Sequence, residues 1–342
     1  DNAGLQIGCP SDKVRGILLC LDVTEEIVNE AIDLDCNLII SHHPLLFKPI
    51  RTLTGKTYVE RCLMQACRHN IAIYSAHTNL DNAYRGVNFK LAEKIGLQNV
   101  RILKPKEGSL LKLATFVPVE HAETVRNILF NAGAGYTGDY DSCSFNVGGT
   151  GTFRGLENSD PFVGTKGELH AEKEVRIEVI IPSYKKSSVM RALLAAHPYE
   201  EPAFDFYPLV NSWDRAGSGV VGELPIEEDE ESFLQRIKAI FQLKSITHSP
   251  FTGKMIREVA LCGGSGAFLI PDAIAYGADV FLTGEARYND YYDVEDRILL
   301  GALGHYETEE CTKEIFYDVI TKKIPNFAIH FTSVNTNPVN YM

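Results

Sequence analysis

The sequence lacks any apolar run that approaches the roughly 20 residues that a membrane-spanning helix needs. It also lacks an excess of basic residues, because 33 Lys and Arg stand against 45 Asp and Glu. The resulting formal net charge of -12 argues against nonspecific nucleic-acid binding and for a soluble protein. We therefore expect neither a membrane nor a nucleic acid as a partner, and a small-molecule substrate instead.

Cysteine pairs at metal-binding spacing are missing too, because the eight cysteines are scattered and none forms a Cys-x-x-Cys motif. Cys20, Cys36 and Cys262 lie in or beside apolar runs. Small buried hydrophobic residues in a reducing cytoplasm explain this pattern better than disulfides or a zinc–thiolate site. The expected location is the cytoplasm. The chain opens at Asp1 without a methionine, and we expect further residues before it in the natural protein.

Strand-like and helix-like segments alternate at both ends of the 342-residue chain, which is long enough for about two domains. Near the start, strands are predicted at 15–22, 36–40 and 71–74, and helices at 24–34, 57–69 and 87–95. The last third repeats the plan, with strands at 258–262, 279–283 and 298–303, a helix at 267–276 and another that ends near Lys323. This repeat indicates an internal duplication, and the predicted fold class is α/β with two pseudo-symmetric lobes.

The segment between the halves has a different character. Strands are predicted at 111–117, 175–181 and 203–209, helices at 122–132 and 187–196, and hairpins in the Gly-rich stretch 133–155. Two β-α-β units in about 110 residues indicate an inserted α+β domain of ferredoxin-like, PII-like type. The predicted domains are therefore a discontinuous α/β core, 1–104 and 215–342, and an insert, 105–214.

Two adjacent histidines end the second predicted strand, in the motif Ser41-His42-His43-Pro44. Proline cannot donate to a strand ladder, so both imidazoles should lie just past the carboxyl end of a strand, where open α/β sheets bind ligands. Because neighbouring side chains along a strand point apart, the pair suits two ions better than one. A lone histidine pair is more often structural, but the partners at similar strand ends favour a metal site.

These partners come from both halves of the duplication. His305-x-x-x-Glu309 matches His77-x-x-x-Asp81, and Glu285 falls where His43 falls. The candidate metal ligands are His42, His43, Asp81, His305 and Glu309. Imidazoles and carboxylates without a thiolate suit zinc, manganese, iron, cobalt or nickel. Five ligands, two of them able to bridge, fit two divalent ions about 3.5–4 Å apart. His77 and Glu285 remain as candidate catalytic residues that orient ligands or carry protons.

Two further motifs have competing interpretations. Gly263-Gly264-Ser265-Gly266 precedes a predicted helix and would offer backbone N–H groups to an anion of the substrate. A tight strand-to-helix turn explains the same glycines equally well. His197-Pro198-Tyr199-Glu200-Glu201 resembles a ligand cluster, but a helix end followed by a turn is the favoured interpretation.

Seven motifs span nearly the whole chain: DNAGLQIG at 1–8, SHHP at 41–44, HTNLD at 77–81, HPYEEP at 197–202, GGSG at 263–266, LTGE at 282–285 and GHYETE at 304–309. As a set they resemble the Nif-three-like family, the GTP cyclohydrolase 1 type 2 homologues, in the long form that carries an insert. The resemblance implies a dinuclear metal site made by the five ligands above, with Glu309 bridging. It also implies a toroidal homohexamer whose metal sites face a central cavity, a PII- or CutA-like insert, and a helix before Asp1.

Two classes of function remain open at this point. The first is metal-dependent hydrolysis. Its substrate would be a purine nucleotide such as GTP, with His77 or Glu285 moving protons and the 263–266 turn near the phosphates, or else a phosphoester or an amide. The second class is a non-catalytic metal-binding scaffold or regulator, whose insert senses a small molecule or a metal.

Overall fold

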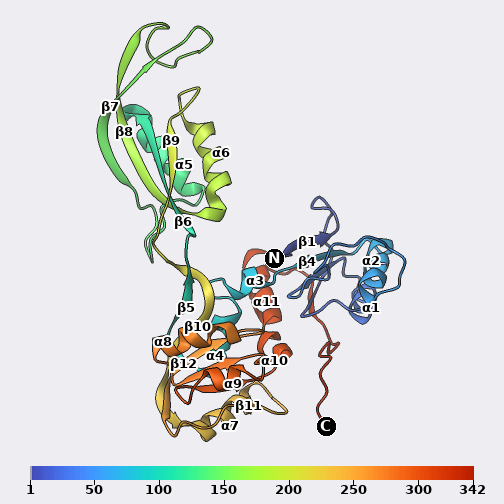
Figure 1. The fold of residues 1–342 in the computed structure, drawn as a ribbon. Helices are drawn as coiled ribbons and strands as arrows, with labels where there is room; N and C mark the ends of the chain where they lie inside the picture. Colours follow the sequence, from blue (N-terminus) through green and yellow to red (C-terminus); the bar gives the residue numbers. More distant parts are fainter. Residues whose placement is uncertain (1) are drawn as a thin grey trace. The chain divides into compact units, whose positions relative to one another are not determined.

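The computed structural model describes residues 2–342, so Asp1, the first residue of the 1–8 motif, lies outside the described residues. The chain forms two compact units (Figure 1). One combines the residues up to Lys104 with Arg215–Met342, and the other is Pro105–Asp214. All eight cysteines are free thiols, and five of them are buried. Within residues 2–342, none of the helices is both long and apolar enough to cross a membrane.

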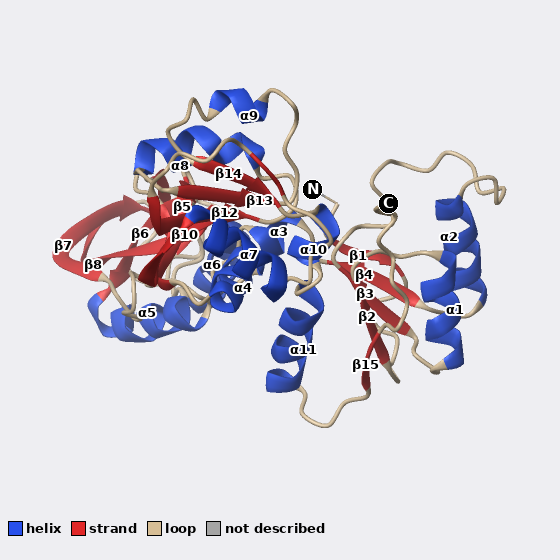
Figure 2. Cartoon of the chain, turned by 90° about the horizontal axis from the view of Figure 1, so that it is seen from below, coloured by secondary structure: helices blue, strands red, loops and turns tan. Residues whose placement is uncertain are grey.

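The first lobe of the larger unit is a five-stranded sheet in the order β1-β4-β3-β2-β15. Four of its strands run parallel, and β1 is antiparallel to β4. The bounds are Gly4–Ile7 for β1, Ile17–Cys20 for β2, Leu38–Ser41 for β3, Ala72–Ser75 for β4 and Ile329–Phe331 for β15. Helices α1 (Glu25–Asp33) and α2 (Tyr58–Arg68) pack on one face, and α11 (Thr312–Lys323) covers the other through Phe316 (Figure 2). The helices cover the two faces, so the ends of the strands stay available for a site.

Threonine side chains start the first two helices. Thr24 accepts a hydrogen bond from the N–H of Ile27, and Thr57 accepts one from the N–H of Glu60. Each bond satisfies an N–H of the first turn, which has no partner within the helix. The predicted helices and strands of this lobe are confirmed. Helix α3 (Thr78–Asp81), where the sequence indicated only a loop after the 71–74 strand, was not predicted; the N–H groups of Leu80 and Asp81 bond back to the His77 carbonyl.

The second lobe is a six-stranded sheet in the order β11-β14-β13-β12-β10-β5. The bounds are Gln98–Lys106 for β5, Trp213–Asp229 for β10, Thr247–His248 for β11, Met255–Cys262 for β12, Val280–Thr283 for β13 and Leu299–Ala302 for β14. Helices α4 (Val87–Ile95) and α7 (Glu230–Ile240) cover one face, and α8 (Ile270–Tyr276) covers the other. The parallel strands β12, β13 and β14 repeat the parallel β2, β3 and β4, which confirms the two-lobe α/β fold.

Two helices of this lobe differ from the prediction. The helix expected at 267–276 opens as a 3-10 turn, Ala267–Leu269, and becomes α-helical only at Ile270. Pro271 stands in the first turn of α8, where its missing N–H costs nothing. The predicted helix that ends near Lys323 is α11, and a separate short helix, α10 (His305–Glu309), precedes it. A further short helix, α9 (Asp290–Asp293), was not predicted.

The smaller unit has the ferredoxin-like order of elements. Its strands and helices are β6 (Leu110–Pro118), α5 (Ala122–Asn131), β7 (Phe145–Arg154), β8 (Leu169–Pro182), α6 (Lys186–Ala196) and β9 (Phe204–Pro208). The sheet is antiparallel in the order β7-β8-β6-β9, and both helices pack on one of its faces over Leu113 and Ile177. The predicted ferredoxin-like insert is confirmed. The Gly-rich stretch contributes one long strand, β7, paired along its whole length with β8.

Removing the insert is expected to leave metal binding intact. All five candidate ligands belong to the larger unit, and β5 and β10, which lead into and out of the insert, are neighbouring strands. A short glycine-rich turn in place of residues 106–212 should therefore join them without disturbing the sheet. Elemental analysis of the shortened protein after loading with zinc or manganese should match that of the full chain. A shortened protein with native-like circular dichroism that binds no metal would contradict this expectation.

Candidate metal centre

The first lobe brings four candidate residues to one edge of its sheet. His42 and His43 follow β3 directly, and His77 lies just after β4 at the start of α3, which ends at Asp81. The strands are parallel neighbours, with Ser41 of β3 opposite Ser75 of β4, so the residues after them meet at the same edge. The rings of His42 and His77 lie 5.4 Å apart, and those of His43 and His77 lie 5.6 Å apart.

The second lobe contributes two ligands from one turn of helix. Gly304, with φ of 103°, turns the chain from β14 into α10. His305 and Glu309 are four residues apart in α10 and therefore share a face. Their Nε2 and Oε2 atoms lie 3.0 Å apart, and the Glu309 side chain is buried.

Each of three imidazoles is held through its Nδ1 atom. These atoms lie 2.9 Å from the Ala76 carbonyl oxygen for His42, 2.7 Å from Asp22 Oδ1 for His43 and 2.8 Å from Glu285 Oε1 for His305. Carbonyl and carboxylate oxygens only accept hydrogen bonds, so each Nδ1–H donates and each neutral ring keeps its lone pair on Nε2. The same arrangement orients metal-binding histidines in proteins generally.

The three Nε2 atoms converge on the Glu309 carboxylate. His43 Nε2 lies 2.9 Å from Glu309 Oε2, and His42 Nε2 lies 3.7 Å from Glu309 Oε1 and 3.5 Å from Asp81 Oδ1. Nevertheless, His42 Nε2 and Asp81 Oδ1 are buried without a hydrogen-bond partner in the described part of the chain. Burying unpaired polar atoms is costly unless something binds to them. The ligand atoms therefore fit a metal ion better than they fit one another.

The ligand atoms form overlapping groups, each within a span of 4.8 Å. One group is His43, His305 and Glu309, and a second is His42, Asp81 and Glu309. A third joins His42 and His43 to His77. Glu309 belongs to both groups that contain a carboxylate, which is the arrangement that a bridging ligand between two ions requires.

The electrostatics of the centre follow from its burial and close charges. Burial alone would raise the pKa of Glu309, but the three imidazoles around its carboxylate hold it well below its usual value. Burial raises the pKa of Asp81 to about 6 despite the opposing effect of His42. For His43, the contacts with Asp22 and Glu309 outweigh burial and raise the pKa to about 10. A metal ion that binds here must therefore displace a proton from His43 at neutral pH.

The Gly263–Gly266 turn lies beside the shared ligand Glu309. The N–H groups of its three glycines donate to the side chains of Asn88, Thr308 and Thr283. These donors are engaged within the fold, and a substrate contact of Gly263, Gly264, Ser265 or Gly266 stays a prediction. At Gly264, with φ of 60°, a Cβ atom would clash with the Glu309 carboxylate. The turn thus makes room for the shared ligand.

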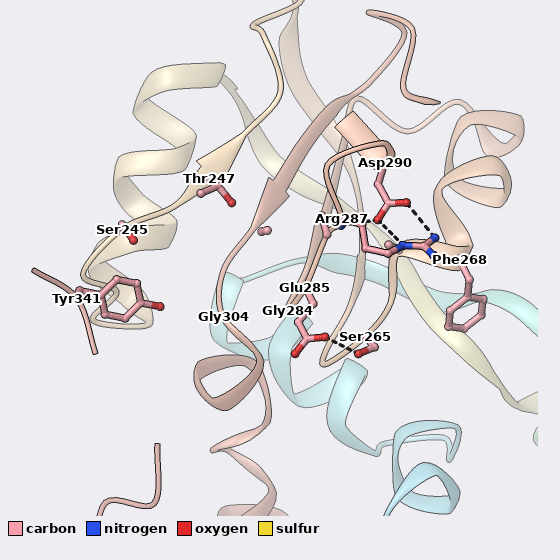
Figure 3. A pocket seen from close by; sticks show the side chains of 13 residues that line it. Ser245, Thr247, Ser265, Phe268, Gly284, Glu285, Arg287, Asp290, Gly304 and Tyr341 are labelled. Carbon is pink, nitrogen blue, oxygen red and sulfur yellow. Dashed lines mark hydrogen bonds and ion pairs between the residues drawn. The ribbon is translucent and has the colours of Figure 1, made fainter. Parts of the chain in front are cut away.

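A cavity of about 540 Å³ opens beside Glu285 (Figure 3). The Ser265 hydroxyl donates to Glu285 Oε2 at 2.8 Å, while the other oxygen of Glu285 holds His305. Arg287 lines the same cavity and pairs at 3.2 Å with the buried Asp290. The arginine side chain is nevertheless 88% exposed. The cavity therefore offers a guanidinium group and hydroxyls next to a residue that touches the metal centre.

Sequence reasoning missed two of the groups that orient the histidines. Asp22 could have been found, because Cys20 of β2 pairs with Ser41 of β3 and Asp22 and His43 each follow two residues later. The Ala76 carbonyl leaves no trace in the sequence, because any residue supplies one. The anion-binding potential of Arg287 was missed as well.

Replacing Asp22 with asparagine is expected to weaken metal binding about 10–100-fold, because the ligand His43 loses the charged acceptor that orients it. The affinity for zinc can be measured by competition with a chelating dye. Asp33→Asn, at an exposed position of α1, is the matched control and should bind zinc normally. Equal affinities for the two variants would show that Asp22 has no part in the centre.

Known proteins resemble this chain over nearly its whole length. Residues 1–338 match the family described as Duf34/NIF3 (NGG1p interacting factor 3). The "GTP cyclohydrolase 1 type 2 homolog" of Halalkalibacterium halodurans is 36% identical, covering 100% of this chain and 93% of that protein. The protein of the same name from Bacillus subtilis is 34% identical with the same coverage. The crystal structure of a Bacillus cereus protein related to NIF3 has a TM-score of 0.84 at 38% identity, covering 100% of this chain and 93% of that one.

Proposed function

We propose, starting from the fact that this chain belongs to the Duf34/NIF3 family, that it is a metal-dependent hydrolase with a dinuclear centre. The observation that carries the proposal is the position of Glu309 in both carboxylate-containing groups of ligand atoms. One divalent ion would be held by His43, His305 and Glu309, and the other by His42, Asp81 and Glu309. Zinc, iron or manganese suits such a donor set.

Bound ions of this kind act as Lewis acids and lower the pKa of coordinated water toward about 7. His77 is the proposed proton acceptor beside them. Burial, followed by the neighbouring His42 and His43, lowers the pKa of His77 to about 4, so its ring is neutral at pH 7. A neutral imidazole can take up a proton from a reacting group. Glu285 fixes the orientation of His305 and is the second proposed proton-handling residue.

A purine nucleotide such as GTP is the proposed substrate. The names of the relatives support this choice, as does the cavity beside Glu285, where Arg287 suits an anionic group and the hydroxyls of Ser265 and Thr247 suit a polar one. The proposed role of Ser265 as a substrate contact belongs to the same cavity.

The test is turnover of GTP, other nucleotides and model phosphoesters by the full chain loaded with zinc or manganese. We expect hydrolysis of a nucleotide that is lost in His43→Ala and kept in His69→Ala, which changes an exposed histidine at the end of α2. Calorimetric titration of GTP against metal-loaded and metal-free protein gives a second readout. Equal binding by both forms, without turnover of any substrate, would favour a metal-binding scaffold instead.

We also propose, from the family resemblance, that the chain assembles as a toroidal homohexamer. Light scattering after size-exclusion chromatography should give a mass six times that of the 38.0 kDa chain. A monomer or dimer over the accessible concentration range would contradict this proposal.

A further inference from the structure

A second cavity, of about 830 Å³, lies within the insert. The side chains of Leu113 and Ile177 point from the insert's sheet toward its helices. Side chains alternate along a strand, so Phe116 of β6 and Glu174 of β8 lie on the opposite face, and both line the cavity. The cavity is therefore formed on the face of the sheet that α5 and α6 leave uncovered.

Glycines form the floor of this cavity. In the paired strands β7 and β8, Gly149 stands opposite Glu174 and Gly151 stands opposite Glu172. Nothing lies within 4 Å of the place where a Cβ atom of Gly149 would be, whereas a Cβ atom on Gly151 would clash with the Glu174 carboxylate. The missing side chains leave a flat surface with one carboxylate lying over it.

Aromatic rings form the walls. The ring of Tyr199 lies 5.8 Å from that of Phe153 and 6.3 Å from that of Phe162, and Phe116 also lines the cavity. The buried His197 holds this wall in place, because its Nδ1 accepts from the N–H of Tyr199 at 3.1 Å and its Nε2 donates to the Phe116 carbonyl at 2.9 Å. The HPYEEP motif does end a helix, as expected, and it also builds this wall.

Glu174 supplies the polar centre of the cavity. Glu174 is only 7% exposed, and the Tyr199 hydroxyl donates to its Oε1 at 2.8 Å. Across residues 2–342 no basic side chain forms an ion pair with Glu174, and the neighbouring Arg176 is paired with Glu178 at 2.7 Å. A buried carboxylate with one hydroxyl donor and no cation is under-compensated, so a cationic partner would bind to it favourably.

We propose that this cavity binds a small organic cation, with an amine or amidinium group carried on a flat apolar body. The cationic group would pair with Glu174, and the flat body would lie over the glycine floor between aromatic rings, which also attract cations. The charges around the cavity also favour a cation. Glu200 and Glu201 add two carboxylates, whereas the basic residues are Arg154 and Arg176, and Arg176 is already paired with Glu178.

The test is calorimetric titration of the full chain at neutral pH with three probes of nearly the same shape: benzamidinium, benzamide and benzoate. We expect benzamidinium to bind at least about tenfold more tightly than the neutral benzamide, and benzoate not to bind. Glu174→Gln should reduce the affinity for benzamidinium to that for benzamide. Glu123→Gln, an exposed position on α5, should leave it unchanged.

A second variant keeps the test decisive if Glu174→Gln fails to fold. Gly149→Val fills the floor without altering any charge and should abolish binding of benzamidinium, whereas Gly148→Val places its side chain on the other face of the strand and should not. Equal affinity for the cation and the neutral amide, or unchanged affinity in Gly149→Val, would overturn the proposal. Absence of benzamidinium binding by the unmodified chain would also overturn it, and a smaller oligomer in Gly149→Val would then indicate a contact between copies of the chain.

Discussion

Replacing Glu309 with glutamine should empty the metal centre, so that the metal content of the saturated protein falls from the proposed two ions per chain to nearly none. Glu309 is the one ligand common to both carboxylate-containing groups, and its oxygens lie 2.9 Å from His43 Nε2 and 3.0 Å from His305 Nε2. Glutamine keeps the size of the side chain but loses the charge and one of the two oxygens that a bridging ligand needs. Elemental analysis after loading with zinc and desalting gives the stoichiometry directly.

Two further variants separate this effect from a general loss of structure. Glu307→Gln changes the neighbouring carboxylate of α10, which accepts from Asn337 at 3.0 Å and contacts none of the candidate ligands, so two ions should remain. His305→Ala should remove mainly one ion, because His305 belongs to only one group. If Glu309→Gln retained both ions, the shared carboxylate would not be a ligand.

Gly264→Ala should weaken metal binding at least about tenfold while the protein stays folded. The new methyl group would meet the Glu309 carboxylate, the far end of a side chain that can move without unfolding the lobe. Glu309 would then leave the position from which it faces His43 and His305. The left-handed backbone at Gly264, with φ of 60°, adds a stability cost of about 1–2 kcal/mol.

Gly277→Ala is the matched control for this prediction. Gly277 also has a left-handed backbone, with φ of 90°, but nothing lies within 4 Å of its missing Cβ atom. Both variants should lose a similar free energy of unfolding in urea, and only Gly264→Ala should lose affinity for zinc. Parallel losses of stability with unchanged zinc affinity in both would mean that Glu309 adapts freely, and the tight fit between the turn and the carboxylate would have no function.

The sequence predicted those site residues whose role follows from their position at the end of a strand. Apolar runs located β3 and β14, and parallel strands bring their carboxyl ends to one edge, so His43 and His305 could be recognised before their contacts were known. Asp22 required the further knowledge that β2 and β3 are neighbours in a given register. For a residue two or three positions beyond a strand end, the pairing of the strands determines its role as much as its residue type does.

Contacts between distant segments were not predictable in this way. The 263–266 turn has the composition of an anion site, yet Asn88 and Thr308, from helices far away in the sequence, accept from its N–H groups. The cavity of the insert depends on Gly149 standing opposite Glu174, across a connection of 14 residues between β7 and β8 whose length does not fix the register. The local sequence pattern predicts the helices and strands, whereas the 263–266 turn and the cavity of the insert depend on how these helices and strands pack together.

The division of the ligands between the two lobes couples metal affinity to the folding equilibrium. His42, His43 and Asp81 belong to the first lobe, whereas His305 and Glu309 are held by the second. An ion bound to ligands from both lobes would hold them together, because the lobes could separate only by giving up some of these ligands. At a free metal concentration 100 times the dissociation constant, this linkage stabilises the closed arrangement by about 2.7 kcal/mol. Chelation should therefore act on this protein as a mild denaturant does, loosening the contact between two halves that are otherwise intact.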